Sequence, residues 1–205
     1  MKLTLLVLTS CTFIVATEVL KRKFSLPATF TRRLVHIGTA VVAGISPFFV
    51  TQKEIVFVSI IFAVVLLAGR RYNIFSAIHS VERNTLGEVF LPLGVALTAL
   101  LFLPHNVAAF QFGIFIMGIS DALAGLAGEK FGSHHFFVFK NKKSIEGSLA
   151  FFITSLVLAF LFVPTFGYQL FVISIVLTLV EAGLVYGLDN LILPLLAAAL
   201  VQYFF

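Results

Sequence analysis

Charged residues are scarce in this chain, cysteine is almost absent and tryptophan does not occur. Only 11% of the 205 residues are charged, 60% are hydrophobic, and the mean hydropathy is +1.10. Because a soluble domain carries about 25% charged residues, this composition excludes a soluble globular protein. The single cysteine, Cys11, lies inside an apolar run, which excludes a disulfide framework and a thiolate metal site.

The signature motifs of several enzyme classes are also missing. The sequence has no HExxH zinc motif, Walker-type phosphate loop, GxSxG nucleophile elbow or GxGxxG dinucleotide fingerprint. His134 and His135 are adjacent, so they lack the one-turn spacing of a helical metal pair. A nucleotide or metal site in this chain must therefore be built from other residues.

Long apolar runs fill most of the sequence. A membrane-spanning helix needs about 20 apolar residues, with roughly 17 as a lower limit. The runs predict an all-α fold, a polytopic membrane helix bundle of about eight transmembrane helices, with residues 1–205 forming a single integral membrane domain. The candidate spans are 3–20, 34–50, 54–69, 88–104, 107–127, 148–164, 168–186 and 189–205.

The positions of the basic residues predict the orientation of these spans. Of the 14 Lys and Arg residues, all but Lys2 and Lys53 fall on the side that holds the first, third, fifth and seventh connections. Cytosolic loops carry an excess of Lys and Arg, so we expect both termini on the non-cytosolic side. All 9 acids except Glu54 also gather near the cytosolic side, which topology alone does not require.

Asp121 lies well inside a candidate span, in the segment "GISDALAGLAGEKFG" at residues 118–132. Burying an ionisable group in a membrane costs several kcal/mol, so Asp121 marks a candidate functional site. The alternative is a packing seam, since glycines let membrane helices approach closely. At 100° per residue, four glycines share a stripe with Asp121: Gly118, Gly125, Gly128 and Gly132.

A basic cluster follows in "KNKKSIEGS", residues 140–148. Ser144 is predicted to cap a helix that begins near Ile145, with Glu146 in its first turn. Lysines beside a positively charged helix N-terminus indicate a bound anion, and a phosphate fits. The alternative is an orientation signal or contact with lipid headgroups. The lysines are Lys140, Lys142 and Lys143.

Further ionisable residues gather at the inner ends of other spans. In two places an acid is followed about one turn later by a proline. Because proline has no backbone N–H, it leaves backbone carbonyls without a helical partner near the membrane face. The alternatives are snorkelling for the basic residues and helix-dipole partners for the acids. These candidates are Arg32, Arg33, His36, Glu88 with Pro92, Asp189 with Pro194, and Glu181.

Together these residues indicate phosphoryl chemistry at a membrane face. Carboxylates hold hard cations such as Mg²⁺, and basic residues neutralise a polyphosphate while catalysis rests on positioning and charge stabilisation. The residues alone predict a membrane enzyme that acts on a phosphorylated nucleotide and a lipid.

Five segments resemble, in the same order, the family of dolichol kinase, phytol kinase and yeast-type diacylglycerol kinase. The resemblance covers residues 30–200 and is most specific between Asp121 and Ser148. It implies a kinase that uses CTP and a divalent metal, Mg²⁺ or Ca²⁺, to phosphorylate phytol, farnesol, polyprenol, dolichol or diacylglycerol at the cytosolic face. The segments are "RRLVHIGTA", "LGEVFLPLGVALTALLF", "GISDALAGLAGEKFG", "KNKKSIEGSLAFF" and "LVEAGLVYGLDNLILPLLAAAL".

Roles for individual residues follow from the motifs and the resemblance. We expect Asp121, Glu146, Glu88 and Lys143 to serve catalysis, with Asp121 and Glu146 as the metal ligands. The expected partners are the lipid alcohol, CTP and membrane lipids, without nucleic acid. The expected nucleotide contacts are Arg32, Arg33, His36, Gly125, Gly128, Lys130, Lys140, Lys142, Lys143, Ser144 and Gly147.

Two other functions compete with a lipid-alcohol kinase. A phosphatidate cytidylyltransferase, distantly similar to this family, would form a CDP-lipid from CTP and a lipid phosphate. The loop "GSHHFFVFKNKKS" lacks the second acid of that enzyme class, which argues against it. A transporter would need ionisable groups along a path through the membrane, and the acids instead gather near one face.

Overall fold

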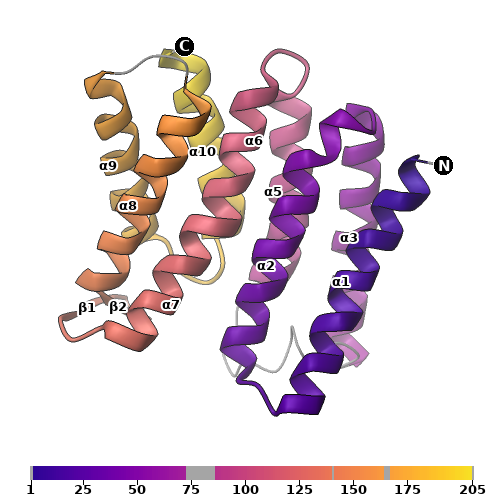
Figure 1. Cartoon of the computed structure of the whole chain (residues 1–205), viewed down its shortest axis with the longest axis horizontal. Coiled ribbons are helices and arrows are strands. Elements are labelled where there is room, and N and C mark those ends of the chain that lie inside the picture. Colours follow the sequence, from indigo (N-terminus) through magenta and orange to yellow (C-terminus); the bar gives the residue numbers. More distant parts are fainter. Residues whose placement is uncertain (1, 73–85, 140, 164–166, 205) are drawn as a thin grey trace.

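The structure is a computed structural model that describes residues 2–72, 86–139, 141–163 and 167–204 (Figure 1). Each of the predicted apolar runs forms a helix, so the helical bundle is confirmed. The helices are α1 (Lys2–Phe24), α2 (Ala28–Ile45), η1 (Ser46–Phe48), α3 (Gln52–Tyr72), α5 (Gly87–Phe102), α6 (Val107–Phe115), η2 (Ile116–Ser120), α7 (Asp121–Phe131), α8 (Ile145–Phe162), α9 (Tyr168–Gly183) and α10 (Asp189–Phe204).

The described helices differ in their length relative to a membrane. Four are long and apolar enough to cross one, at Lys2–Phe24, Gln52–Arg70, Val107–Phe131 and Ile145–Phe162. Gly87–Phe102, Tyr168–Gly183 and Asp189–Phe204 are apolar but shorter. An integral membrane bundle is therefore supported, while the number of eight spans stays a prediction. The start of α1 and the end of α10 lie toward the same end of the bundle (Figure 1).

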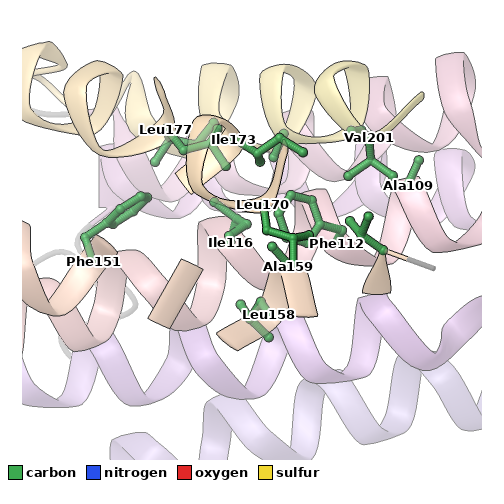
Figure 2. Close-up of a cluster of buried hydrophobic side chains, with 14 of the residues drawn as sticks. Ala109, Phe112, Ile116, Phe151, Leu158, Ala159, Leu170, Ile173, Leu177 and Val201 are labelled. Carbon is green, nitrogen blue, oxygen red and sulfur yellow. The ribbon is translucent and has the colours of Figure 1, made fainter. Parts of the chain in front are cut away.

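A long central helix, formed by α6, η2 and α7 in succession, separates two apolar cores. The first core packs it against α8, α9 and α10 through side chains such as Phe112, Phe151 and Ile173 (Figure 2). The second packs it against α2, α3 and α5 through side chains such as Phe110 and Ile114. All five of these side chains are fully buried, so the central helix is held firmly from both sides.

The middle of this central helix is a π-helical turn, η2, directly before Asp121. Such turns are rare in helices and occur frequently at functional sites. On one side the helix meets α2 so closely that a Cβ on Gly118 would lie 3.1 Å from the carbonyl oxygen of His36. The π-turn and this close contact fix where Asp121 begins α7.

A two-stranded antiparallel hairpin precedes α8, where the sequence indicated only a connection between helices. Strand β1 (His135–Val138) pairs with β2 (Asn141–Ser144). The all-α prediction is therefore amended by this small sheet. Side chains alternate along a strand, so neighbouring lysines point in opposite directions: Lys142 is exposed and Lys143 is half-buried.

The start of α8 agrees with the sequence. Ser144 is the N-cap, and its Oγ accepts a hydrogen bond from the backbone N–H of Gly147 at 3.1 Å. This bond satisfies one of the backbone donors that a helix leaves unpaired at its first turn. The predicted cap is confirmed, and it fixes the hairpin relative to α8.

Candidate functional site

Three acids from different helices gather at the end of the bundle that carries the hairpin. Asp121 begins α7, Glu181 lies in the last turn of α9 and Asp189 begins α10. The carboxylate of Asp121 interacts electrostatically with both other acids and with Lys143 and Arg32. We call Asp121, Glu181 and Asp189 the acidic cluster. Like charges held this close require cations, which the two basic side chains supply.

Lys143 joins the hairpin to this cluster. Its Nζ lies 2.6 Å from Oε1 of Glu181 and also donates a hydrogen bond to the backbone carbonyl of the same residue. The Lys143 and Glu181 side chains are only 17% and 9% exposed. Because α9 ends here, its last carbonyls carry partial negative charge, so the ammonium group neutralises both a carboxylate and a helix end.

The turn between α9 and α10 places Asp189. Gly187 has φ +85°, a conformation that glycine adopts without a steric penalty. A Cβ there would lie 2.5 Å from the backbone of Gly87. The buried Asn190 side chain then donates from Nδ2 to the carbonyl of Gly87 at 2.8 Å. Together these contacts attach the start of α10 to the start of α5.

Arg32 lies at the same junction. A Cβ on Gly87 would lie 2.6 Å from Nη2 of Arg32, so the guanidinium group rests directly on the start of α5. Arg32 interacts electrostatically with both Asp121 and Asp189. It thus places a permanent positive charge beside both the acidic cluster and the start of α5.

The predicted nucleotide glycines are covered by protein atoms. A Cβ on Gly125 would lie 2.5 Å from Nε of Arg33, and one on Gly128 would lie 2.9 Å from Oγ of Ser144. A Cβ on Gly147 would lie 3.0 Å from the carbonyl oxygen of Ala124. These glycines therefore let α2, α7 and α8 pack closely. This agrees with the alternative interpretation of the glycine stripe as a packing seam.

Two of the predicted catalytic acids have other partners. Oε1 of Glu146 lies 2.8 Å from Nδ1 of His134 and also accepts from the His134 backbone N–H at 3.1 Å. Glu88, with an 8% exposed side chain, forms an ion pair with Arg70 at 2.9 Å. Asp189 and Glu181, rather than these two acids, are the carboxylates whose charges act on Asp121.

The other predicted contacts are spread around this end of the bundle. Arg33 pairs with Glu129 at 2.5 Å. Lys130 is exposed and lies over the ring of Phe131, 5.2 Å from its centre. His36 is buried in α2, and Lys142 points outward from β2. Lys140 lies outside the described residues.

The acidic cluster suits a hard divalent cation. No group of three His, Cys, Asp or Glu residues within the described ranges forms a ready metal site. Mg²⁺ in nucleotide enzymes needs only one or two carboxylates, because phosphates and waters complete its shell. Glu181 is engaged by Lys143, which leaves Asp121 and Asp189 as the two acids of the cluster that could hold such an ion. The metal pair of Asp121 and Glu146 stays a prediction, and Glu146 pairs with His134 in the structure.

Sequence reasoning singled out Glu181 and Asp189 as ionisable groups but did not place them with Asp121. Asp189 repeats the pattern of Glu88, an acid at a helix start with a proline a few residues later. That repeat is the local signal that marks Asp189. The contacts that bring α9 and α10 beside α7 depend on tertiary packing, which the sequence pattern does not reveal.

Comparison with known proteins places this chain in a family. It is 31% identical over 199 residues to the phytol kinase of Synechocystis sp., a match that covers 93% of this chain and 85% of that protein. It is also 37% identical over 116 residues, about half of each chain, to an uncharacterised protein of Rickettsia prowazekii. No protein-family model and no solved structure matches it. The chain belongs to the family of lipid-alcohol kinases that includes phytol kinase.

Proposed function

We propose that this protein transfers the terminal phosphate of CTP to the hydroxyl of an isoprenoid or other lipid alcohol, with phytol as the first candidate. The observation that carries the proposal is the acidic cluster beside Lys143 and Arg32, in a chain similar over most of its length to a phytol kinase. Acids that hold a cation and basic groups that hold phosphates are the two requirements of phosphoryl transfer.

The basic groups bind and orient the nucleotide. Arg32 and Lys143 border the acidic cluster from α2 and from the hairpin, so a triphosphate placed there meets positive charge on two sides. The capped N-terminus of α8 adds partial positive charge next to the hairpin. Lys143 is bound to Glu181 before the nucleotide arrives, and we infer that the phosphates compete for it.

The acidic cluster would bind the cation and accept the proton of the alcohol. Asp121 and Asp189 would hold Mg²⁺, which neutralises phosphate charge when it is bound. The alcohol oxygen attacks the terminal phosphorus, the bond to the bridging oxygen breaks, and CDP leaves. The hydroxyl proton passes to a carboxylate of the cluster. Positioning and charge stabilisation account for most of the catalysis in such a step.

We also propose that this end of the bundle faces the cytosol, where CTP is available. The basic ends of α1 and α3 lie at the same end as the hairpin (Figure 1), and positive residues favour the cytosolic side.

An activity assay that compares four nucleotides, one at a time, tests the proposal. Detergent-purified protein is given phytol, Mg²⁺ and either CTP, ATP, GTP or UTP, and lipid monophosphate is measured. We expect phytyl phosphate and CDP with CTP at the highest kcat/KM. Phosphatidate serves as a parallel acceptor, because CDP-lipid and pyrophosphate formed from it would instead identify a cytidylyltransferase. Absence of lipid phosphate with every nucleotide and a panel of lipid alcohols would contradict the proposal.

A further inference from the structure

A cavity separate from the acidic cluster lies between α1, α2, α3 and α5, the four helices on the N-terminal side of the bundle (Figure 1). It holds about 760 Å³ of empty space, its open mouth included. Each of the four helices contributes to the wall, with residues such as Leu6, Val42, Phe62 and Val95.

The wall is apolar even where it contains hydroxyl groups. Ser10 donates to the carbonyl of Leu6 at 3.0 Å, Thr39 to that of Val35 at 2.7 Å and Ser46 to that of Ala43 at 2.7 Å. Because these hydroxyls are hydrogen-bonded within their own helices, they need no polar group of a ligand as a partner. Such a wall suits a hydrocarbon chain.

The polar side chains of the cavity gather toward the hairpin end. His36 and Glu88 line it there, and they are 7% and 8% exposed. Gly87, next to Glu88, touches Arg32, and Arg32 is one turn from His36 on α2. Arg32 in turn interacts with Asp121 and Asp189. The polar end of the cavity therefore adjoins the acidic cluster across Arg32.

The length of the cavity matches one leaflet of a membrane. It follows α2 from His36 to the end of this helix and reaches Ser46, the first residue of η1, about 15 Å at 1.5 Å per residue. The hydrocarbon core of a bilayer is about 30 Å thick, so one leaflet is about half of this. A hydrocarbon chain of about this length therefore fits within one leaflet.

The packing of α1 leaves a route into this cavity. Thr17 is the only buried residue on α1, and this helix packs mainly against α2. The side of the cavity between α1 and α3 is therefore closed by few contacts, and a chain can pass there directly from the lipid.

We propose that this cavity binds the hydrocarbon chain of the alcohol, with the hydroxyl at the end formed by His36 and Glu88. The identity of the ligand as an acceptor alcohol rests on the proposed function, whereas binding of the chain is tested on its own. The chain enters between α1 and α3, and Arg32 lies between the polar end of the cavity and the acidic cluster.

Cross-linking on the wild-type protein tests the site without any need for turnover. The probe is a long-chain alcohol that carries a diazirine in its chain, with excess phytol as competitor. We expect labelled peptides from α1, α2, α3 or α5, and loss of the label with phytol. Label on α8, α9 or α10 would overturn the proposal. If the probe labels the cavity but the protein turns over no nucleotide, the binding site for the chain is supported and the proposed kinase function is contradicted.

Kinetics of a matched pair of variants give the second measurement. Ser59 lines the cavity and is 8% exposed, whereas its neighbour Ile60 is 47% exposed on the outer face of α3. Ser59→Phe fills the cavity, and we expect the KM for phytol to rise about tenfold or more with the KM for CTP unchanged. A short alcohol such as geraniol should be less affected. Ile60→Phe should leave both constants unchanged, and equal values for the two variants would overturn the proposal.

Discussion

Lys143 of the hairpin and Glu181 at the end of α9 form an ion pair, with 2.6 Å between Nζ and Oε1, across 38 positions of the sequence. The pair attaches the predicted phosphate-binding strand to the acidic cluster. Asp121 and Asp189 lie within electrostatic range of the same lysine, which forms its ion pair with Glu181. Loss of Lys143 would leave the charge of Glu181 buried without its ion-pair partner.

The two neighbouring lysines of β2 should differ strongly in their effect. Lys143→Ala leaves Glu181 unpaired, so we expect a loss of roughly 3 kcal/mol in the free energy of unfolding. We also expect kcat/KM for CTP to fall on the order of 100-fold. Lys142→Ala removes an exposed side chain, and its effect on stability should stay within about 0.5 kcal/mol. Denaturation in detergent and CTP titrations measure both; similar effects of the two variants would contradict the inward role of Lys143.

Magnesium titrations show whether Asp189 or Glu146 holds the metal together with Asp121. Asp189→Asn should raise the Mg²⁺ concentration for half-maximal activity about 10- to 100-fold, because it removes a proposed ligand. Glu146→Gln should leave this concentration unchanged, since Glu146 binds His134. Its expected effect is a small loss of stability, because the bond to His134 is weakened. If Glu146→Gln raised this Mg²⁺ concentration and Asp189→Asn did not, Glu146 would be the metal ligand, as the sequence motif predicted.

A methyl group added to the contact between α7 and α8 should destabilise the protein. In Gly147→Ala, the new Cβ would lie 3.0 Å from the backbone oxygen of Ala124, so we expect a loss of about 1–3 kcal/mol from overpacking. Gly183 offers the control, because a Cβ there meets no atom within 4 Å. Gly183→Ala should leave stability unchanged or raise it by about 0.4–1 kcal/mol. Thermal unfolding of both variants measures the difference.

The proposed membrane orientation predicts a labelling pattern. In a Cys11→Ser background, Lys142→Cys places a thiol on the hairpin and Lys53→Cys places one at the opposite end of the bundle. A membrane-impermeant maleimide added to intact cells should label only the second protein. Permeabilised cells should label both. Labelling of the hairpin thiol in intact cells would place the acidic cluster on the outer face and contradict access to cytosolic CTP.

Local signals in the sequence were enough for much of the fold. The apolar runs predicted the helices because a chain in lipid must satisfy its backbone internally. Ser144 was predicted as a cap from its position before Ile145, and the bond to Gly147 confirms it. The same signals placed Asp121 beside a basic segment near one face, and the structure brings Lys143 within electrostatic range of this acid.

The partners of individual side chains could not be predicted in the same way. Glu146 meets His134 through the hairpin, and that hairpin has strands of only four residues with no clear alternation of apolar and polar side chains. Lys143 meets Glu181 through the packing of α8 against α9. Such contacts depend on how whole elements pack, whereas helical periodicity reports only which residues share a face.

The most direct test of the acidic cluster compares the wild-type protein with Asp121→Asn, using CTP labelled at the terminal phosphate, phytol and Mg²⁺. We expect the wild type to move the label into phytyl phosphate. The variant should remain folded and bind the alcohol probe, but transfer label about 1,000-fold more slowly, since a metal-holding carboxylate contributes several kcal/mol to the transition state. Glu18→Gln changes an acid outside the cluster and controls for the loss of charge. Near-normal transfer by Asp121→Asn would contradict the central role given to this cluster.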